Sequence, residues 1–213
     1  QNPDEVRYVT MLREPVSRVV SSYKYIRRTP VHRFYSTVRK MDFETFVDNL
    51  EPMRLANLQT KLAVGLKERQ HDEKLMDVAR AKAHLSEWFV DVGIFEDYDV
   101  SLLKFRDVLG WNGYPFYEIL NTTSNLISVS DAVRERILQS NALDAELHQW
   151  AWRKFNEERN KIQNLDDKLE TLHQSNLAYK EGIRNGQQRN TQKAKLMRQL
   201  KLIARQKHKI FKY

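Results

Sequence analysis

Arg13 and Ser21 are the two side chains whose types and spacing most directly suggest a bound ligand. A guanidinium can hold a phosphate group through two hydrogen bonds, and a serine hydroxyl can donate one more. Ser21 lies about two helical turns beyond the turn that carries Arg13, so it reaches only a ligand that runs along the helix, such as a nucleotide. The alternative is an ordinary strand-to-helix turn, in which Arg13 pairs with a carboxylate and Ser21 faces solvent.

The residues around this pair predict a strand, a turn and a helix start. The run 8–12, Tyr-Val-Thr-Met-Leu, is rich in β-formers and has the length of a buried strand. Pro15 suits the first helical position because its missing N–H has no intrahelical partner there, and Glu14, before the proline, is disfavoured in a helix. Arg13 would then lie at the carboxyl end of the strand, where open α/β sheets bind ligands, beside first-turn N–H groups that attract anions.

Outside this stretch the hydrophobic pattern predicts a helix-rich chain with one more strand. A basic loop is expected at 29–40, directly after the first helix. The strands are expected at 7–12 and 89–94. The helices are expected at 15–28, 43–50, 53–63, 72–87, 98–109, 130–140 and 143–163.

Length and charge predict one domain followed by a basic extension. The chain has 213 residues and a net charge of +8, which fits a domain at 1–163 and an extension at 164–213. Residues 161–213 hold 13 Lys/Arg and 4 Asp/Glu, so the positive excess comes from there. From Thr191 onward, apolar residues recur at helical spacing among lysines and arginines, as in a basic amphipathic helix that lies on an anionic polysaccharide, a membrane surface or nucleic acid. A solvated or disordered extension is the alternative.

Cysteine content and targeting signals narrow the classes of protein that the sequence can represent. The chain has no cysteine, which excludes a disulfide framework and a thiolate metal site, and its six histidines show no metal-ligand spacing. No apolar run is long enough to span a bilayer, and there is no signal-peptide pattern. Asn121-Thr122-Thr123 forms an N-glycosylation sequon.

Three later segments continue the pattern that begins at Arg13. They are the run 53–66, the block 89–111 with its Val-Gly-Ile-Phe-Glu and Ser-Leu-Leu stretches, and the helix-like block 143–155. In this order the chain resembles the membrane-bound glycan sulfotransferase family that includes the heparan sulfate 2-O- and 6-O-sulfotransferases, over roughly residues 6–160. The resemblance implies a helix-rich, P-loop-NTPase-like α/β domain that binds 3′-phosphoadenosine 5′-phosphosulfate (PAPS) across the ends of a parallel sheet.

The resemblance also implies roles for individual residues. Arg13 and Ser21 would hold the 3′-phosphate of PAPS, and Tyr23 would lie near the cofactor on the same helix. A polar cluster with further expected cofactor contacts consists of Asn57, Gln59 and Thr60. The basic side chains expected to bind the acceptor are Lys24, Arg27, Arg28 and Arg33. Gly93 and Glu96 match a strand-to-helix turn and are expected to be structural.

One part of the family pattern has no match in this chain. A Lys-x-Gly-(Ser/Thr)-Thr loop, which would hold the 5′-phosphosulfate, is absent, and the family's catalytic base lies upstream of the segment that resembles this chain. The chain therefore looks like the C-terminal portion of such an enzyme, and we expect it to be inactive alone.

The function implied by the resemblance is transfer of the sulfuryl group from PAPS to a hydroxyl of a heparan sulfate-like glycan, with no metal. The implied location is the lumenal side of the Golgi membrane, although the lack of an anchor or signal leaves a cytoplasmic location open. The alternative is a non-catalytic protein in which a degenerate sulfotransferase-like domain and the basic extension bind an anionic polymer. Nucleic acid is the weakest of the candidate partners.

Overall fold

The structure is a computed structural model that describes residues 6–67, 70, 72, 74–117 and 127–184. It divides into two compact units. The described residues of the first unit end at Gly113 and resume from 127 to Leu165, and those of the second are 114–117 and 166–184. The elements are β1 (Tyr8–Leu12), α1 (Pro15–Arg28), α2 (Tyr35–Val38), α3 (Phe43–Asp48), α4 (Leu58–Ala63), α5 (Val78–Trp88), β2 (Phe89–Ile94), the 3-10 helix η1 (Phe95–Asp97), α6 (Tyr98–Leu109), α7 (Asp131–Ser140), α8 (Ala142–Arg159) and α9 (Leu165–Arg184).

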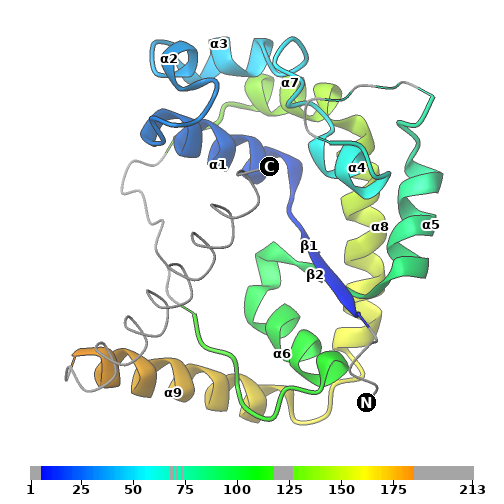
Figure 1. Cartoon of the computed structure of the whole chain (residues 1–213), viewed down its shortest axis with the longest axis vertical. Helices are drawn as coiled ribbons and strands as arrows, with labels where there is room; N and C mark the ends of the chain where they lie inside the picture. Colours follow the sequence, from blue (N-terminus) through cyan, green and yellow to red (C-terminus); the bar gives the residue numbers. More distant parts are fainter. Residues whose placement is uncertain (1–5, 68–69, 71, 73, 118–126, 185–213) are drawn as a thin grey trace, which may run out of the picture. The chain divides into compact units, whose positions relative to one another are not determined.

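Two hydrogen-bonded parallel strands form the sheet of the first unit, and they overlap in the view of Figure 1. In their register Leu12 of β1 pairs with Ile94 of β2. Parallel strands require a long crossover connection, and the segment from α1 to α5 supplies it. Because both strands end at the same edge, the residues that follow them, 13–14 and 95–96, are neighbours in space.

Helices α1, α3 and α7 enclose an apolar core of the first unit (Figure 1). Helix α1 buries one face at helical spacing, and its buried apolar side chains are Val16, Val19, Tyr23 and Ile26. Phe46 of α3 and Ile137 of α7 are both 0% exposed against this face. The face of α1 that points away from this core is therefore left for polar residues.

Gly93 allows α6 to lie directly on β2. A Cβ at this position would lie 2.7 Å from the Phe105 ring and 2.8 Å from Ser101 Cβ. Ser101 cannot retreat without cost, because its hydroxyl accepts from the Ile94 N–H and donates to the Ile94 carbonyl, both at 2.8 Å.

Gly93→Ala is therefore expected to lower the free energy of unfolding by about 1–3 kcal/mol, the usual cost of overpacking. Urea denaturation measures the change. Gly113→Ala is the matched control, because nothing lies within 4 Å of a Cβ built there. Equal stabilities of the two variants would contradict the close-packing explanation.

The predicted helix at 53–63 is wrong in its first half. Helix α4 begins only at Leu58, because Arg54 and Asn57 have φ angles of 60° and 47°. This left-handed conformation interrupts a right-handed helix.

The predicted helix at 72–87 also begins later than expected. Helix α5 begins at Val78, where the Asp77 carboxylate accepts hydrogen bonds from the N–H groups of Ala79 and Arg80. An aspartate in this position is a strong N-terminal cap. The first strand and the helix at 15–28 are confirmed, by β1 and α1.

Three further predictions concern the basic loop, the sequon and the basic segment. The basic loop expected at 29–40 contains the short helix α2. The sequon at 121–123 and the basic segment from Thr191 lie outside the described residues. None of the described helices combines the length and apolar composition needed to cross a bilayer.

Candidate anion-binding site

Arg13 lies at the carboxyl ends of both strands, with its guanidinium carbon 4.2 Å from the centre of the Phe95 ring. The side chain is half-buried, and its Nε is buried without a hydrogen-bond partner. No described residue hydrogen-bonds or ion-pairs with this guanidinium. Burial lowers the pKa of Arg13, and the nearby Glu96 and Glu14 carboxylates oppose that shift. A guanidinium stays charged in proteins, so this edge of the sheet holds a cation with unused donors.

Gln59 fixes the backbone on which Arg13 stands. Its amide oxygen accepts the Arg13 N–H at 2.8 Å, and its amide nitrogen donates to the Arg13 carbonyl at 2.8 Å. Gln59 was expected to contact a cofactor. In this structure both ends of its amide are engaged with Arg13, which makes Gln59 a residue that positions the guanidinium.

Glu14 caps the helix that follows. One oxygen of its carboxylate accepts the Ser17 N–H at 2.7 Å, and the other lies 3.9 Å from the Arg134 guanidinium. The expectation that the first-turn N–H groups of α1 are free for an anion is thus wrong for Ser17, because the chain supplies its own carboxylate there. The guanidinium of Arg13, rather than the helix start, is the cationic centre of the site.

Glu96 joins this turn to α8. One of its oxygens accepts the Glu14 N–H at 2.9 Å, and the other lies 3.3 Å from His148 Nε2. Burial raises the pKa of Glu96, but hydrogen bonds from His148 and from backbone N–H groups outweigh burial and lower the pKa overall. Glu96 is therefore held as a carboxylate next to Arg13.

Ser21 lies on a polar stripe that runs along α1 away from Arg13. Four residues at i, i+4, i+7 and i+11 make up the stripe, on the face opposite the buried one; they are Ser17, Ser21, Lys24 and Arg28. Ser21 is half-buried, and no described residue hydrogen-bonds its hydroxyl. It stands about 9 Å along the helix axis from Pro15, so a ligand reaching from Arg13 to Ser21 must lie along α1.

Tyr23 points into the core. It is 4% exposed, its hydroxyl donates to the Met41 carbonyl at 2.8 Å, and its ring packs on Phe43 and Phe46. Arg27 hydrogen-bonds the same hydroxyl. Tyr23 was expected to contact the cofactor and Arg27 the acceptor. Both instead hold the far end of α1 against α3.

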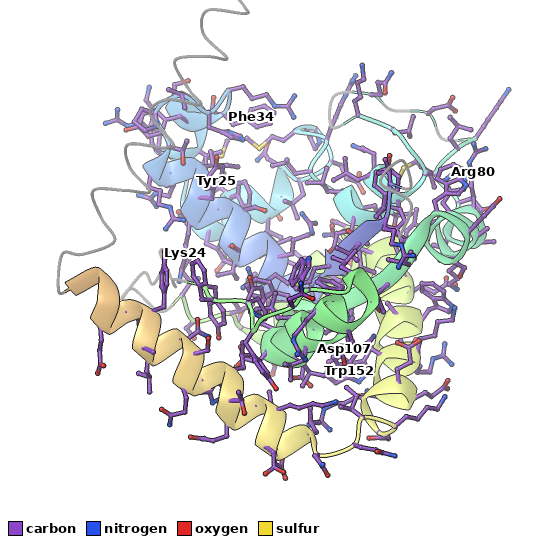
Figure 2. The ribbon with its side chains drawn as sticks, turned by 60° about the horizontal axis from the view of Figure 1, so that its bottom comes forward. Lys24, Tyr25, Phe34, Arg80, Asp107 and Trp152 are labelled. Carbon is purple, nitrogen blue, oxygen red and sulfur yellow. The ribbon has the colours of Figure 1, made fainter. Side chains whose placement is uncertain are left out.

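The remaining residues expected to bind an acceptor lie away from Arg13. Arg28 is in the last turn of α1, about 20 Å from its start, and Arg33 lies beyond it with its guanidinium 4.3 Å from the Phe34 ring centre. Figure 2 shows Lys24 and Tyr25 on α1 and Phe34 beyond its end. Residues 15–41 hold seven Lys/Arg and no Asp/Glu. Arg18 is buried with Asp144, and the other six are exposed or partly exposed and form a basic surface that begins at Lys24, toward the opposite end of the helix from Arg13.

The cluster of Asn57, Gln59 and Thr60 belongs to a reciprocal cap between α4 and α8. The Asn57 side-chain oxygen accepts the N–H groups of Leu143 and Asp144 at the start of α8, at 3.0 and 3.2 Å. In return the Asp144 carboxylate accepts the N–H groups of Gln59 and Thr60 at the start of α4, at 3.2 and 2.7 Å. Each helix start is thus satisfied by a side chain of the other.

Arg18 completes this buried network from α1. Its guanidinium donates to Asn141 Oδ1 at 2.6 Å and to the Leu55 carbonyl at 3.2 Å, and its Nε lies 3.4 Å from Asp144. Burial lowers the pKa of Arg18, and Asp144 opposes that shift. The network therefore fixes α4, and with it Gln59 and Arg13, against α1 and α8.

Sequence reasoning missed Phe95, His148 and Arg134 as parts of this site and assigned Glu96 a mainly structural role. A signal was present for Phe95 and Glu96, because residues after neighbouring parallel strands meet at one edge. No local pattern marks His148 or Arg134, which the packing of α8 and α7 brings near. Among the described residues no group of His, Asp and Glu could hold a metal ion.

No protein-family model, no curated protein and no solved structure matches the chain. The resemblance to glycan sulfotransferases therefore stays a prediction from the sequence.

Proposed function

We propose that the Arg13 end of the sheet binds the 3′-phosphate of PAPS, and that the chain is part of a PAPS-dependent glycan O-sulfotransferase. The observation that carries this proposal is the half-buried guanidinium of Arg13, which has unused donors at the carboxyl edge of a parallel sheet. Guanidinium donors suit a phosphate dianion, which accepts two parallel hydrogen bonds. Ser21 would add a hydroxyl further along α1.

In this proposal the described residues position the cofactor and do not break its S–O bond. Sulfuryl transfer needs an acceptor hydroxyl in line with the leaving phosphate, a base for the hydroxyl proton and donors for the charge on the leaving group. Arg13 meets none of these needs directly, because it holds the distant 3′-phosphate. Its contribution is to fix the nucleotide so that the opposite end of PAPS is presented in one orientation.

The proposed acceptor is an anionic polysaccharide of the heparan sulfate kind, and the proposed setting is the lumenal side of the Golgi membrane. The basic surface around Arg28 and Arg33 supports the acceptor class, because a run of 27 residues without a carboxylate, 15–41, attracts polyanions. Its distance from Arg13 suits a polymer that lies across one end of α1 while the nucleotide occupies the other.

Calorimetric titration tests the cofactor half of the proposal. Adenosine 3′,5′-bisphosphate is titrated into the wild-type chain beside 5′-AMP, which lacks only the 3′-phosphate. The proposal predicts at least about tenfold tighter binding of the bisphosphate, the value of one charge-assisted contact. Equal affinity for the two nucleotides would contradict it.

A second candidate function is non-catalytic binding of an anionic polymer. The acid-free run 15–41 favours it, because that surface needs no cofactor to attract a polyanion. Salt-sensitive binding of heparin by a chain that discriminates neither nucleotide would support this candidate over the sulfotransferase.

A further inference from the structure

We infer that His148 and Glu96 position Arg13 for the phosphate, and that a proton on His148 strengthens the hold of the site on a dianion. The inference rests on the proposed function, because it concerns the same guanidinium. It adds a residue pair that lies outside the stretch in which the phosphate contacts were expected.

The geometry shows how the pair reaches Arg13. Glu96 holds the Glu14 N–H at 2.9 Å on one side and faces His148 Nε2 at 3.3 Å on the other. Phe95, the residue before Glu96, stacks its ring against the Arg13 guanidinium, whose central carbon lies 4.2 Å from the ring centre. His148 on α8 therefore fixes η1, and η1 fixes both the turn and the ring on which Arg13 rests.

The charges explain why the proton matters. Glu96 and Glu14 both act on the Arg13 guanidinium, and each repels an arriving phosphate. A carboxylate can only accept hydrogen bonds, so a neutral His148 must donate to Glu96 from Nε2–H. When His148 gains a proton on its other nitrogen, the pair becomes net neutral, and less negative charge opposes the phosphate.

Among the described residues, three other charged groups lie close to this pair. Glu14 and Arg13 follow β1, and Arg134 of α7 lies 3.9 Å from Glu14. Trp152 stacks on the His148 ring within α8. Further charged side chains on or against α8 have partners elsewhere, namely Arg18 with Asp144, Lys82 with Glu146, Lys104 with Asp91 and Glu158, Arg159 with Asp97, Lys61 with the Arg54 carbonyl, and Lys154 with Ser86. Arg153 and Glu157 of α8 are exposed.

The sign of the pH dependence follows from this arrangement. Imidazole side chains as a class gain a proton between pH 8 and pH 5, so the comparison is made at pH 8 and at pH 5.5. The phosphate also gains a proton near pH 6, which weakens its binding in every variant alike. The informative quantity is therefore the ratio of two dissociation constants at one pH, since the ligand's own titration cancels.

The experiment compares His148→Gln with the wild-type chain by calorimetric titration of adenosine 3′,5′-bisphosphate at pH 5.5 and pH 8. Glutamine keeps a donor at the Nε2 position and cannot take up a proton. The ratio of the variant's dissociation constant to that of the wild type is expected to be near 1 at pH 8 and to reach about 2–5 at pH 5.5, the range of a part-exposed ion pair. His84→Gln is the matched control, because His84 contacts the Ala63 carbonyl at the other end of α4 from the Arg13 contact, and its ratio should stay at 1.

Glu96→Gln gives an independent reading at pH 8. It removes the carboxylate charge while keeping an oxygen for the Glu14 N–H, so the bisphosphate should bind about 2–5 times more tightly than to the wild type. Weaker binding, or a His148→Gln ratio that does not change with pH, would overturn the inference and leave the proposed function standing. No bisphosphate binding by the folded wild type at either pH would overturn both.

Discussion

Asp144→Ala is expected to destabilise the chain by about 3–5 kcal/mol, because it leaves a buried guanidinium without its counter-charge. Asp144 is 0% exposed and Arg18 is 8% exposed, so water cannot replace the lost carboxylate. The same substitution frees the N–H groups of Gln59 and Thr60 at the start of α4. The loss therefore combines an unpaired buried charge with an uncapped helix.

Urea denaturation of Asp144→Ala and Glu146→Ala measures this effect against a matched control. Glu146 lies on the same helix and pairs with Lys82 at 2.6 Å, but its side chain is 58% exposed. An exposed ion pair contributes at most about 1 kcal/mol. If the two variants lose similar stability, the buried network does not hold α1, α4 and α8 together.

Arg13→Ala is expected to weaken the binding of adenosine 3′,5′-bisphosphate about ten- to a hundredfold. A hydrogen bond to a charged group contributes about 1.5–3 kcal/mol, which corresponds to that range of dissociation constants. Arg13→Lys should recover only part of the loss, because an ammonium cannot offer two parallel donors. Calorimetric titration at low salt measures all three chains.

The control for this variant is Arg80→Ala. Arg80 is an exposed arginine on α5, and Figure 2 shows it well away from Lys24 on α1. The Arg13 variant should remain folded, because the contact it loses with Phe95 is a cation–π interaction worth about 0.5–1 kcal/mol at a partly exposed site. A similar drop in affinity for both variants would indicate general charge attraction instead of a site.

The segment from Tyr8 to Arg28 could be predicted because its signals are local. A run of β-formers gives β1, and the proline at position 15 marks the first turn of α1. The carboxyl-end position of Arg13 follows from those two elements alone. The same reasoning failed at 53–57, where two residues with positive φ delay the helix.

The partners of the site could not be predicted, because they come from distant parts of the chain. Gln59 reaches back to Arg13, and Asn57 is bound to residues that follow position 140. In the sequence, a polar cluster at the start of a short helix is equally consistent with a ligand-binding site and with a helix cap. Only the packing of α4 against α8 distinguishes the two.

The pairing of Glu96 with His148 depends on packing in the same way. The sequence places Glu96 after a strand and His148 on a helix, and it contains no pattern that brings the two together. Their contact arises because α8 packs along β2. Side chains that modify a site from a neighbouring helix are therefore found only in the folded chain.

The central claim is that Arg13 binds the 3′-phosphate, and its most direct test is a thermodynamic cycle that combines the Arg13 substitution with removal of that phosphate from the ligand. Adenosine 3′,5′-bisphosphate and 5′-AMP are each titrated into the wild type and Arg13→Ala. If Arg13 binds the 3′-phosphate, the bisphosphate loses about ten- to a hundredfold in affinity on substitution, while the affinity for 5′-AMP changes little. If the substitution weakens both nucleotides by the same factor, or neither, Arg13 does not hold the 3′-phosphate and the proposed cofactor site is wrong.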